Sequence, residues 1–198
     1  MIAKPAKIAR TANPVVPCIA MWSEETVSDP QLVVWDHATI NPGRGKPRFA
    51  RIHVHRQRRA MRKLLCQVCG GPADHDRDGV LWLLPDRTRD WPDWPEGMLV
   101  AEPPICHPCA HLATRTCPAL RAEGHHLIRA RAHPVYGVDG FRYRRGPHSP
   151  VAVESEPVAF TDPAVRWIPA SKLVRMLRAC TVVEKNPPYS AGASDIGP

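Results

Sequence analysis

The sequence predicts an α+β protein with a small central module held together by cysteines, flanked by short β-strands and a C-terminal helix. Two Cys-x-x-Cys pairs, Cys66/Cys69 and Cys106/Cys109, lie in the middle of the 198-residue chain, with thirty-six residues between them. Short apolar runs rich in β-branched and aromatic residues recur along the chain. Proline is frequent, at 23 residues, which favours many short elements joined by rigid turns. Apolar residues at three- and four-residue intervals predict a few helices.

The N-terminal part divides into an expected disordered arm, residues 1–14, and a β-rich segment with a basic helix, residues 15–65. Residues 15–22 and 31–35 are short apolar runs that predict strands. A loop rich in Gly and Pro follows at 41–47. Residues 56–65 predict a helix, because Met61, Leu64 and Leu65 fall on one face while the cations point elsewhere.

The central module spans residues 66–120. Residues 79–84 and 97–102 are expected to form the two strands of a hairpin, joined by a link too rich in proline to be a helix or an inner strand. After the second cysteine pair, Pro108 suits the first turn of a helix. An apolar stripe that starts at Cys106 and Cys109 extends this expected helix to Leu120.

The C-terminal part is expected to be β-rich with one helix, residues 121–184, followed by a disordered tail at 185–198. Residues 127–132, 141–145, 151–153 and 158–160 predict strands, with an Asp-Gly turn before the second of them. Pro169 precedes a stripe formed by Leu173, Met176, Leu177 and Cys180, which predicts a helix. A last strand is expected at 181–184.

The two cysteine pairs predict a metal site formed by Cys66, Cys69, Cys106 and Cys109. Four thiolates at this spacing are typical of a tetrahedral structural zinc site. Such a site has no open position for water or substrate, so the zinc would stabilise the fold rather than catalyse a reaction. The other cysteines, Cys18, Cys117 and Cys180, stand among apolar residues and are expected to be buried thiols. This cysteine usage favours a reducing cytoplasm over a disulfide framework.

The formal net charge of +8 is concentrated in residues 41–65, the basic segment, which has nine Lys or Arg residues and no acid. Such a segment attracts the phosphates of nucleic acids. The residues expected to contact or steer nucleic acid are Arg44, Lys46, Arg48, Arg51, Arg56, Arg59, Arg62 and Lys63. The alternative is a solvated helix face beside a zinc module.

Other classes of function are supported less or excluded. No apolar run approaches the length of a membrane span, and the first residues lack the apolar stretch of a secretory signal. No motif for a small-molecule substrate is evident. Trp91 and Trp94 lie in the proline-rich link beside arginines, so a protein–protein interaction module that uses this loop is a second hypothesis.

The order of knuckle, hairpin and ligand-bearing helix over about residues 65–120 resembles a treble-clef zinc finger. HNH endonucleases often use such a framework, and the resemblance would give His75, His107 and His111 roles near a divalent metal. His75, however, precedes the turn at Asp76 rather than leading directly into the strand, and residues 66–120 contain no asparagine. A divalent-metal nuclease is therefore a third hypothesis.

Asp74, Asp76 and Asp78 match the first half of an EF-hand calcium loop, but Pro85 stands where its bidentate Glu is required. An Asp- and Gly-rich turn that enters a strand explains the same residues.

Three stretches of the chain together are similar to small proteins of actinobacteria and their phages. The stretches are Arg-Gln-Arg-Arg-Ala-Met at 56–61, Leu-Cys-Gln-Val-Cys-Gly-Gly at 65–71, and Cys-x-Pro-Cys-Ala at 106–110. This resemblance implies zinc and a bacterial or phage setting, and it implies no activity.

Overall fold

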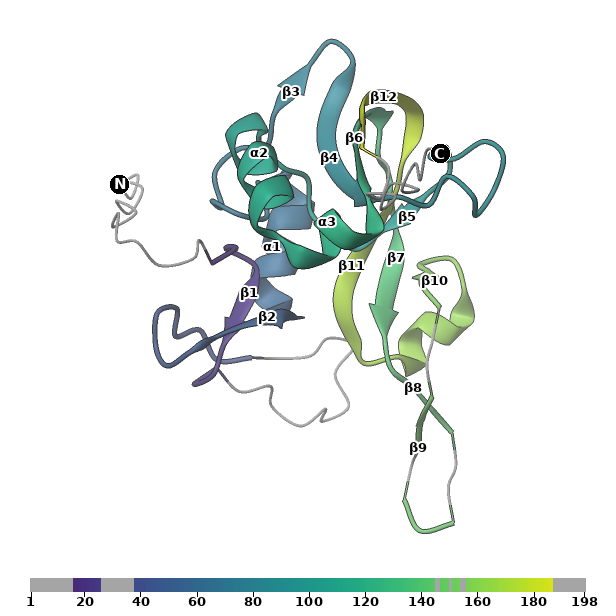
Figure 1. Ribbon diagram of the computed structural model, residues 1–198. Helices are drawn as coiled ribbons and strands as arrows, with labels where there is room; N and C mark the ends of the chain where they lie inside the picture. The colour runs from purple at the N-terminus through teal and green to yellow at the C-terminus, as the bar shows by residue number, and fades with distance from the viewer. Residues whose placement is uncertain (1–15, 26–37, 145–146, 150, 154–155, 187–198) are drawn as a thin grey trace, which may run out of the picture.

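The computed structural model describes residues 16–25, 38–144, 147–149, 151–153 and 156–186, and Figure 1 shows how its elements are arranged. The helices are α1 (Val54–Lys63), α2 (His107–Thr116), α3 (Pro118–Glu123) and the 3-10 helix η1 (Pro163–Trp167). The strands are β1 (Ala20–Trp22), β2 (Pro47–Ile52), β3 (His75–Asp76), β4 (Gly79–Pro85), β5 (Leu99–Val100), β6 (His125–Ala132), β7 (Val135–Gly140), β8 (Arg142–Arg144), β9 (Val151–Val153), β10 (Val158–Ala159), β11 (Ala170–Met176) and β12 (Arg178–Asn186). The described part is thus a mixed fold with few helices and several sheets, as the sequence predicts at this level.

The two larger sheets are joined by two antiparallel strand pairs that follow each other across a bend. One sheet has the strand order β12-β6-β4-β3 and the other β10-β7-β11-β5. Strand β6 pairs with β12 up to Ala132 and Arg178, and β7 then pairs with β11 from Val135 and Arg175 onward. Between these pairs, the N–H of Met176 donates to the carbonyl of Pro134 over 3.0 Å. The two antiparallel pairs therefore continue each other across the bend.

Strand β4 is buried on both faces and divides the core. Val80, Trp82 and Leu84 belong to one cluster, which also contains Met61 of α1 and Leu173 of β11. Leu81 and Leu83 face a second cluster, which contains Cys66, Ile105 and Ala110. Because successive side chains of a strand point to opposite faces, a strand between two core clusters must be apolar throughout. This placement explains the uninterrupted apolar run of residues 80–84.

The expected hairpin between residues 79–84 and 97–102 is wrong. Strand β4 pairs with β3 on one side and β6 on the other, whereas β5 pairs with β11 in the second sheet. The proline-rich link therefore takes the chain from one sheet to the other. The hairpin that follows the first cysteine pair is β3–β4, in which His75 pairs with Val80.

The expected helix from Leu173 to Cys180 is also wrong, because these residues form the end of β11, a bend at Leu177 and the start of β12. Leu173 and Leu177 are both buried in the core shared by the two sheets, one within β11 and the other at the bend that follows it. A bend changes which face of the strand meets the core, so the alternation typical of a strand is lost there. Val174, Thr181 and Val182 are β-branched residues that favour strands, which the helical stripe did not take into account.

Smaller corrections concern the ends of elements. Of the described residues 16–22, only Ala20–Trp22 forms a strand. Strand β2 starts at the last residue of the expected loop and continues through residues for which no element was predicted, and the helix expected at 56–65 is α1, which starts and ends two residues earlier. The expected helix through Leu120 is divided into α2 and α3 at Cys117, just before Pro118. The expected strand at 31–35, the arm at 1–14 and most of the tail lie outside the described residues.

Strand β7 includes the Asp-Gly pair expected to form a turn. Gly137 is required in it, since a Cβ there would lie 1.9 Å from the carbonyl oxygen of Val158.

Candidate metal centre and basic surface

The first two cysteines of the centre lie in a tight knuckle that follows α1. Leu65 and Pro72 form an antiparallel bridge that closes the knuckle at its base. Inside it, the N–H of Cys66 donates to the carbonyl of Gly71 over 2.7 Å, and the N–H of Gly70 donates to the carbonyl of Cys66 over 2.9 Å. Gly70 has a φ of 71°, a conformation that glycine adopts without steric cost. The knuckle thereby fixes the backbone that carries Cys66 and Cys69.

The other two cysteines are placed by the start of α2. Cys106 is the N-cap residue of this helix, Pro108 lies in its first turn, and Cys109 is on the same turn. Ala110 is fully buried against Leu81 and Leu83 of β4, which anchors the helix to the second core cluster. The helix start therefore holds two thiols in a fixed relation to β4 and to the knuckle.

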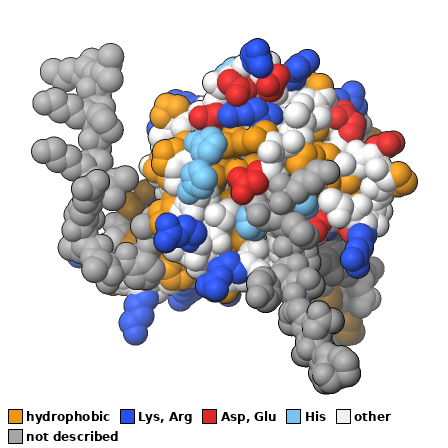
Figure 2. All heavy atoms as spheres, turned by 45° about the horizontal axis from the view of Figure 1, so that its top comes forward, with side chains coloured by type: hydrophobic (Ala, Val, Ile, Leu, Met, Phe, Trp, Pro, Cys, Tyr) orange, Lys and Arg blue, Asp and Glu red, His pale blue; other side chains and the backbone are white. Residues whose placement is uncertain are grey.

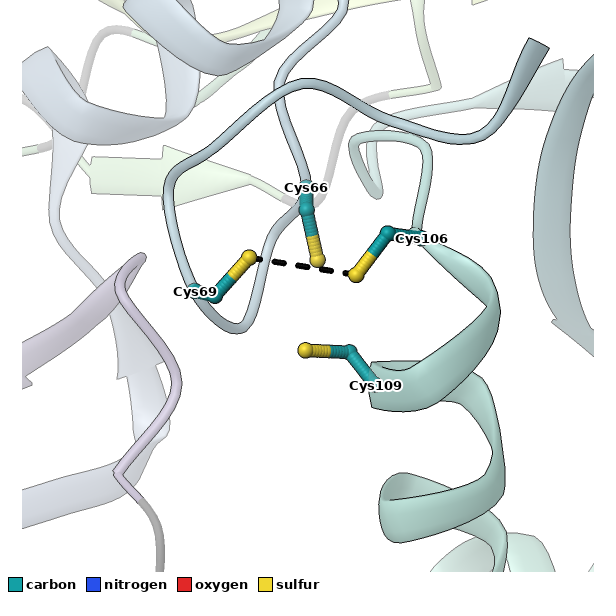
Figure 3. A group of neighbouring side chains, drawn as sticks. All are labelled: Cys66, Cys69, Cys106 and Cys109. Atoms are coloured by element: carbon teal, nitrogen blue, oxygen red, sulfur yellow. Dashed lines mark hydrogen bonds between the residues drawn. The ribbon is translucent and has the colours of Figure 1, made fainter. Parts of the chain in front are cut away.

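The four thiols point toward one another (Figure 3). Their Sγ atoms all lie within 4.8 Å of one another, and those of Cys69 and Cys106 are 3.8 Å apart. In a tetrahedron with zinc–sulfur bonds of about 2.3 Å, two sulfurs are separated by about 3.8 Å. The four cysteines therefore lie close enough together to hold one metal ion.

The electrostatics of the cluster require a cation if the thiols are to ionise. Burial raises the pKa of the Cys109 thiol, and a hydrogen bond with Cys106 and the charges of the neighbouring cysteines raise it further. Four thiolates this close together repel one another strongly. A bound divalent cation reverses this balance, because a coordinated thiol is deprotonated.

A fifth cysteine packs against the knuckle. The N–H of Cys18 donates to the carbonyl of Val68 over 2.7 Å, and a Cβ on Gly70 would lie 2.8 Å from the Cys18 Sγ. Burial raises the pKa of Cys18, which favours a neutral thiol there. The sequence predicts a buried thiol at Cys18 but not its contact with the knuckle. The only signal for that contact is Gly70, which leaves room for another residue to approach closely.

Most of the residues expected to contact nucleic acid are exposed. Arg44, Lys46, Arg48 and Arg51 lie on β2 and the loop before it, while Arg59, Arg62 and Lys63 lie on α1. In addition, β2 exposes Phe49 between its two arginines, and 55% of this side chain is accessible to solvent. The sequence analysis did not single out Phe49, although an aromatic residue between cations is a signal for base stacking.

Arg56 has a different environment from these seven exposed cations. Its two terminal nitrogens donate to the two carboxylate oxygens of Glu25, each over 2.6 Å, and one of them also donates to the carbonyl of Ala20. Glu25 is almost fully buried. Arg56 therefore ties α1 to β1, and its charge is largely neutralised by that carboxylate.

Trp91 and Trp94 are half-buried and pack against the first core cluster. The indole N–H of Trp91 donates to the carbonyl of Glu96 over 3.1 Å. The ring of Trp94 meets that of His126 edge-on, with centroids 5.0 Å apart. Both side chains thus cover the core from the link between β4 and β5.

The three histidines considered for a nuclease lie on two elements, β3 and α2. His75 is exposed on β3, and His107 and His111 are exposed on α2, with ring centroids 4.9 Å apart.

Two arginines engage the aspartates of the calcium-like motif. Arg129 of β6 bonds to Asp74 and forms an ion pair of 3.0 Å with Asp76, and Arg131 pairs with Asp78. Basic and acidic side chains accordingly lie side by side on the face shown in Figure 2. These ion pairs compete with a calcium ion for the carboxylates, and an arginine-stabilised turn accounts for the motif.

Within the described residues, no helix is both long and apolar enough to span a membrane. Comparison of the chain with protein-family models, with curated proteins and with solved structures finds no match in any of the three.

Proposed function

We propose that this protein is a non-catalytic nucleic-acid-binding or adaptor protein, in which Cys66, Cys69, Cys106 and Cys109 hold a structural zinc ion. The four-thiol set matches the preference of zinc for soft ligands in a closed tetrahedral site. The order of the elements along the chain, first the knuckle, then the β3–β4 hairpin and then α2, supports the assignment of a treble-clef-like module. Zinc would here stabilise the backbone from which α1 and its cations project.

One observation carries the nucleic-acid proposal: the basic segment presents seven exposed cations on neighbouring elements, and it contains no acid. The seven are Arg44, Lys46, Arg48, Arg51, Arg59, Arg62 and Lys63. They lie on β2, on the loop before it and on α1, the elements that directly precede the knuckle in the chain. A cationic face of this kind binds phosphates and releases counterions, so its affinity falls steeply with salt.

Arg56 is assigned a different role within this proposal. Its pairing with Glu25 holds the base of β1 against α1, and the exposed cations contact phosphates. Loss of Arg56 would therefore act on binding through the fold.

The test is a titration of labelled DNA and RNA at two salt concentrations. We expect the variant R48A/R51A/R59A/R62A to bind all sequences more weakly, with a salt slope reduced by about 0.7 to 0.9 for each phosphate that the variant no longer neutralises. The matched control R77A/R87A/R89A/R121A removes the same charge from exposed arginines elsewhere and should keep the slope. Equal slopes for the two variants would contradict the proposal. Cleavage in a parallel reaction with magnesium would favour a nuclease instead.

A further inference from the structure

The β8–β9 hairpin projects from the body of the protein at the bottom of Figure 1. Among the described residues its two strands pair only with each other, Arg142 with Val153 and Tyr143 with Ala152. Two aromatic side chains are exposed here: 44% of Tyr143, in β8, and 56% of Phe141, the residue directly before β8, is accessible. Within the described residues the hairpin is therefore a separate ribbon with exposed aromatic rings.

The charge of this hairpin has one sign. Residues 141–153 contain three arginines and a histidine, and no acid. In the strand β8, Tyr143 alternates with Arg142, so the ring and this guanidinium point to opposite faces of the ribbon. Residues 141–153 therefore supply no acidic side chain that could pair with this cation.

The same combination occurs at β2, in the other two-stranded ribbon. Strand β2 reads Arg48-Phe49-Ala50-Arg51, and its pairing with β1 skips from Arg48 to Ile52. This irregularity leaves residues 49–51 outside the ladder, as in a β-bulge that directs side chains outward. The two two-stranded ribbons in the described part of the chain thus each combine an exposed aromatic ring with exposed arginine: Tyr143 with Arg142 in one, and Phe49 with Arg48 and Arg51 in the other.

Exposed rings beside arginines are suited to unpaired bases. In a duplex the faces of the bases are covered by their neighbours, whereas in a single strand they are free to stack on aromatic side chains. Residues two apart in a strand are separated by about 7 Å, twice the 3.4 Å rise of one nucleotide in a nucleic-acid strand. Rings at this spacing can contact successive bases of a single strand that is extended to twice this rise, and the positive charge of the ribbon attracts the phosphates of that strand.

We propose that the β8–β9 hairpin, with Phe141 and Tyr143, and the Phe49 bulge of β2 are stacking sites for the bases of single-stranded nucleic acid. This inference rests on the proposed function and narrows its ligand to single strands. The cations of α1 and β2 supply attraction to any phosphate backbone. The aromatic rings supply the preference for unpaired over paired bases.

The test compares the affinities of the full chain for fluorescein-labelled oligothymidylate, for oligouridylate and for a DNA duplex. We expect a single strand to bind more tightly than the duplex. Removal of one ring in F49A, and of two rings in F141A/Y143A, should each weaken single-strand binding at least about fivefold, with an unchanged salt slope. The conservative variant Y143F should bind like the wild type. The control F160A/W167A removes two exposed aromatics that neighbour the acids Glu156 and Asp162, and it should have no effect.

Several results would overturn the inference, and they differ from those that would overturn the proposed function. Duplex binding as tight as single-strand binding, or F49A and F141A/Y143A variants that bind like the wild type, would refute stacking while salt-dependent binding stood. A change of oligomeric state in F141A/Y143A, with unchanged nucleic-acid binding, would make the hairpin a protein interface. Absence of binding to all three probes at low salt would refute both proposals.

Discussion

The side-chain amide of Gln57 bonds to both backbone groups of Leu173. Its nitrogen donates to the Leu173 carbonyl over 2.9 Å, and its oxygen accepts the Leu173 N–H over 3.0 Å. The same nitrogen also donates to the carbonyl of Ala101 over 2.7 Å. Gln57 is fully buried, so α1 is fixed to β11 by hydrogen bonds shielded from water. Two residues further along β11, the Arg175 side chain donates to the carbonyl of Met61 over 2.9 Å.

Substitution of Gln57 should therefore destabilise the protein. Gln57→Ala removes the side-chain partner of the buried backbone groups of Leu173 and of the half-buried carbonyl of Ala101, and a buried group left unpaired costs about 1–3 kcal/mol. Gln57→Glu keeps the shape but cannot donate to the two carbonyls when ionised, so we expect it to be at least as destabilising. Denaturant unfolding measures both effects, with Gln67→Ala, at a half-buried position of the knuckle, as the control. If Q57A had the stability of the wild type, these hydrogen bonds would make no net contribution to the free energy of unfolding.

The ion pair of Glu25 and Arg56 should make stability depend on pH in the acid range. Burial acts to raise the pKa of Glu25, but hydrogen bonds from Arg56 and from the N–H of Trp22 outweigh it, and the pKa of the carboxyl is lowered from its ordinary value of 4.5. A lowered pKa in the folded state stabilises the protein above pH 4.5. This contribution is lost as the pH falls below 4.5 and through the folded-state pKa.

Glu25→Gln tests this linkage by removing the charge at nearly constant size. The variant leaves Arg56 without its carboxylate, which for a buried pair costs about 3–5 kcal/mol at neutral pH. It should also lose the part of the acid dependence that Glu25 supplies. Thermal or denaturant unfolding at several pH values measures this difference, and Glu24→Gln, at the exposed neighbouring position, is the control. Parallel pH profiles for wild type and E25Q would contradict the assignment.

The parts of the structure that the sequence predicts well are those encoded locally. The cysteine cluster follows from the spacing within each pair, because a knuckle and a helix start each fix two thiols over four residues. The fold then needs only to bring the knuckle and the helix start together. Strand β4 is likewise evident from residues 80–84, whose continuous apolar run reflects burial on both faces.

The parts that the sequence does not predict depend on distant partners. Whether β4 pairs with β5 or with β6 is decided by core contacts between segments that are far apart in the sequence. The bend at Leu177 converts a strand pattern into one with helical spacing, which explains the wrong helix. The role of Arg56 depends on Glu25, 31 residues away, so its charge alone suggested a phosphate contact.

Removal of a thiol from the proposed zinc site should unfold the central part of the chain. Zinc binding contributes about 10–16 kcal/mol in zinc-finger peptides, as much as the whole free energy of unfolding of a typical domain. We expect Cys66→Ser and Cys109→Ser to lose bound zinc, measured by plasma mass spectrometry, together with amide protection around the knuckle and α2. Cys117→Ser, at a half-buried cysteine outside the cluster, should keep both. Full metal content and stability in C66S or C109S would refute the four-thiol site.

Trp94 should contribute to stability through its packing, which separates a structural role from partner capture. The indole packs against the first core cluster and meets the ring of His126, so Trp94→Ala should lower the free energy of unfolding by about 2–4 kcal/mol. Its buried N–H has no acceptor among the described residues, and Trp94→Phe, which removes this donor and keeps an aromatic ring, should therefore retain most of the stability. Trp167→Ala is the control, because 76% of that side chain is exposed and its loss should have little effect. Denaturant unfolding of the three variants measures these differences. If W94A folded with wild-type stability, the indole would be free for a partner, and the interaction-module hypothesis for the Trp91 and Trp94 loop would gain support.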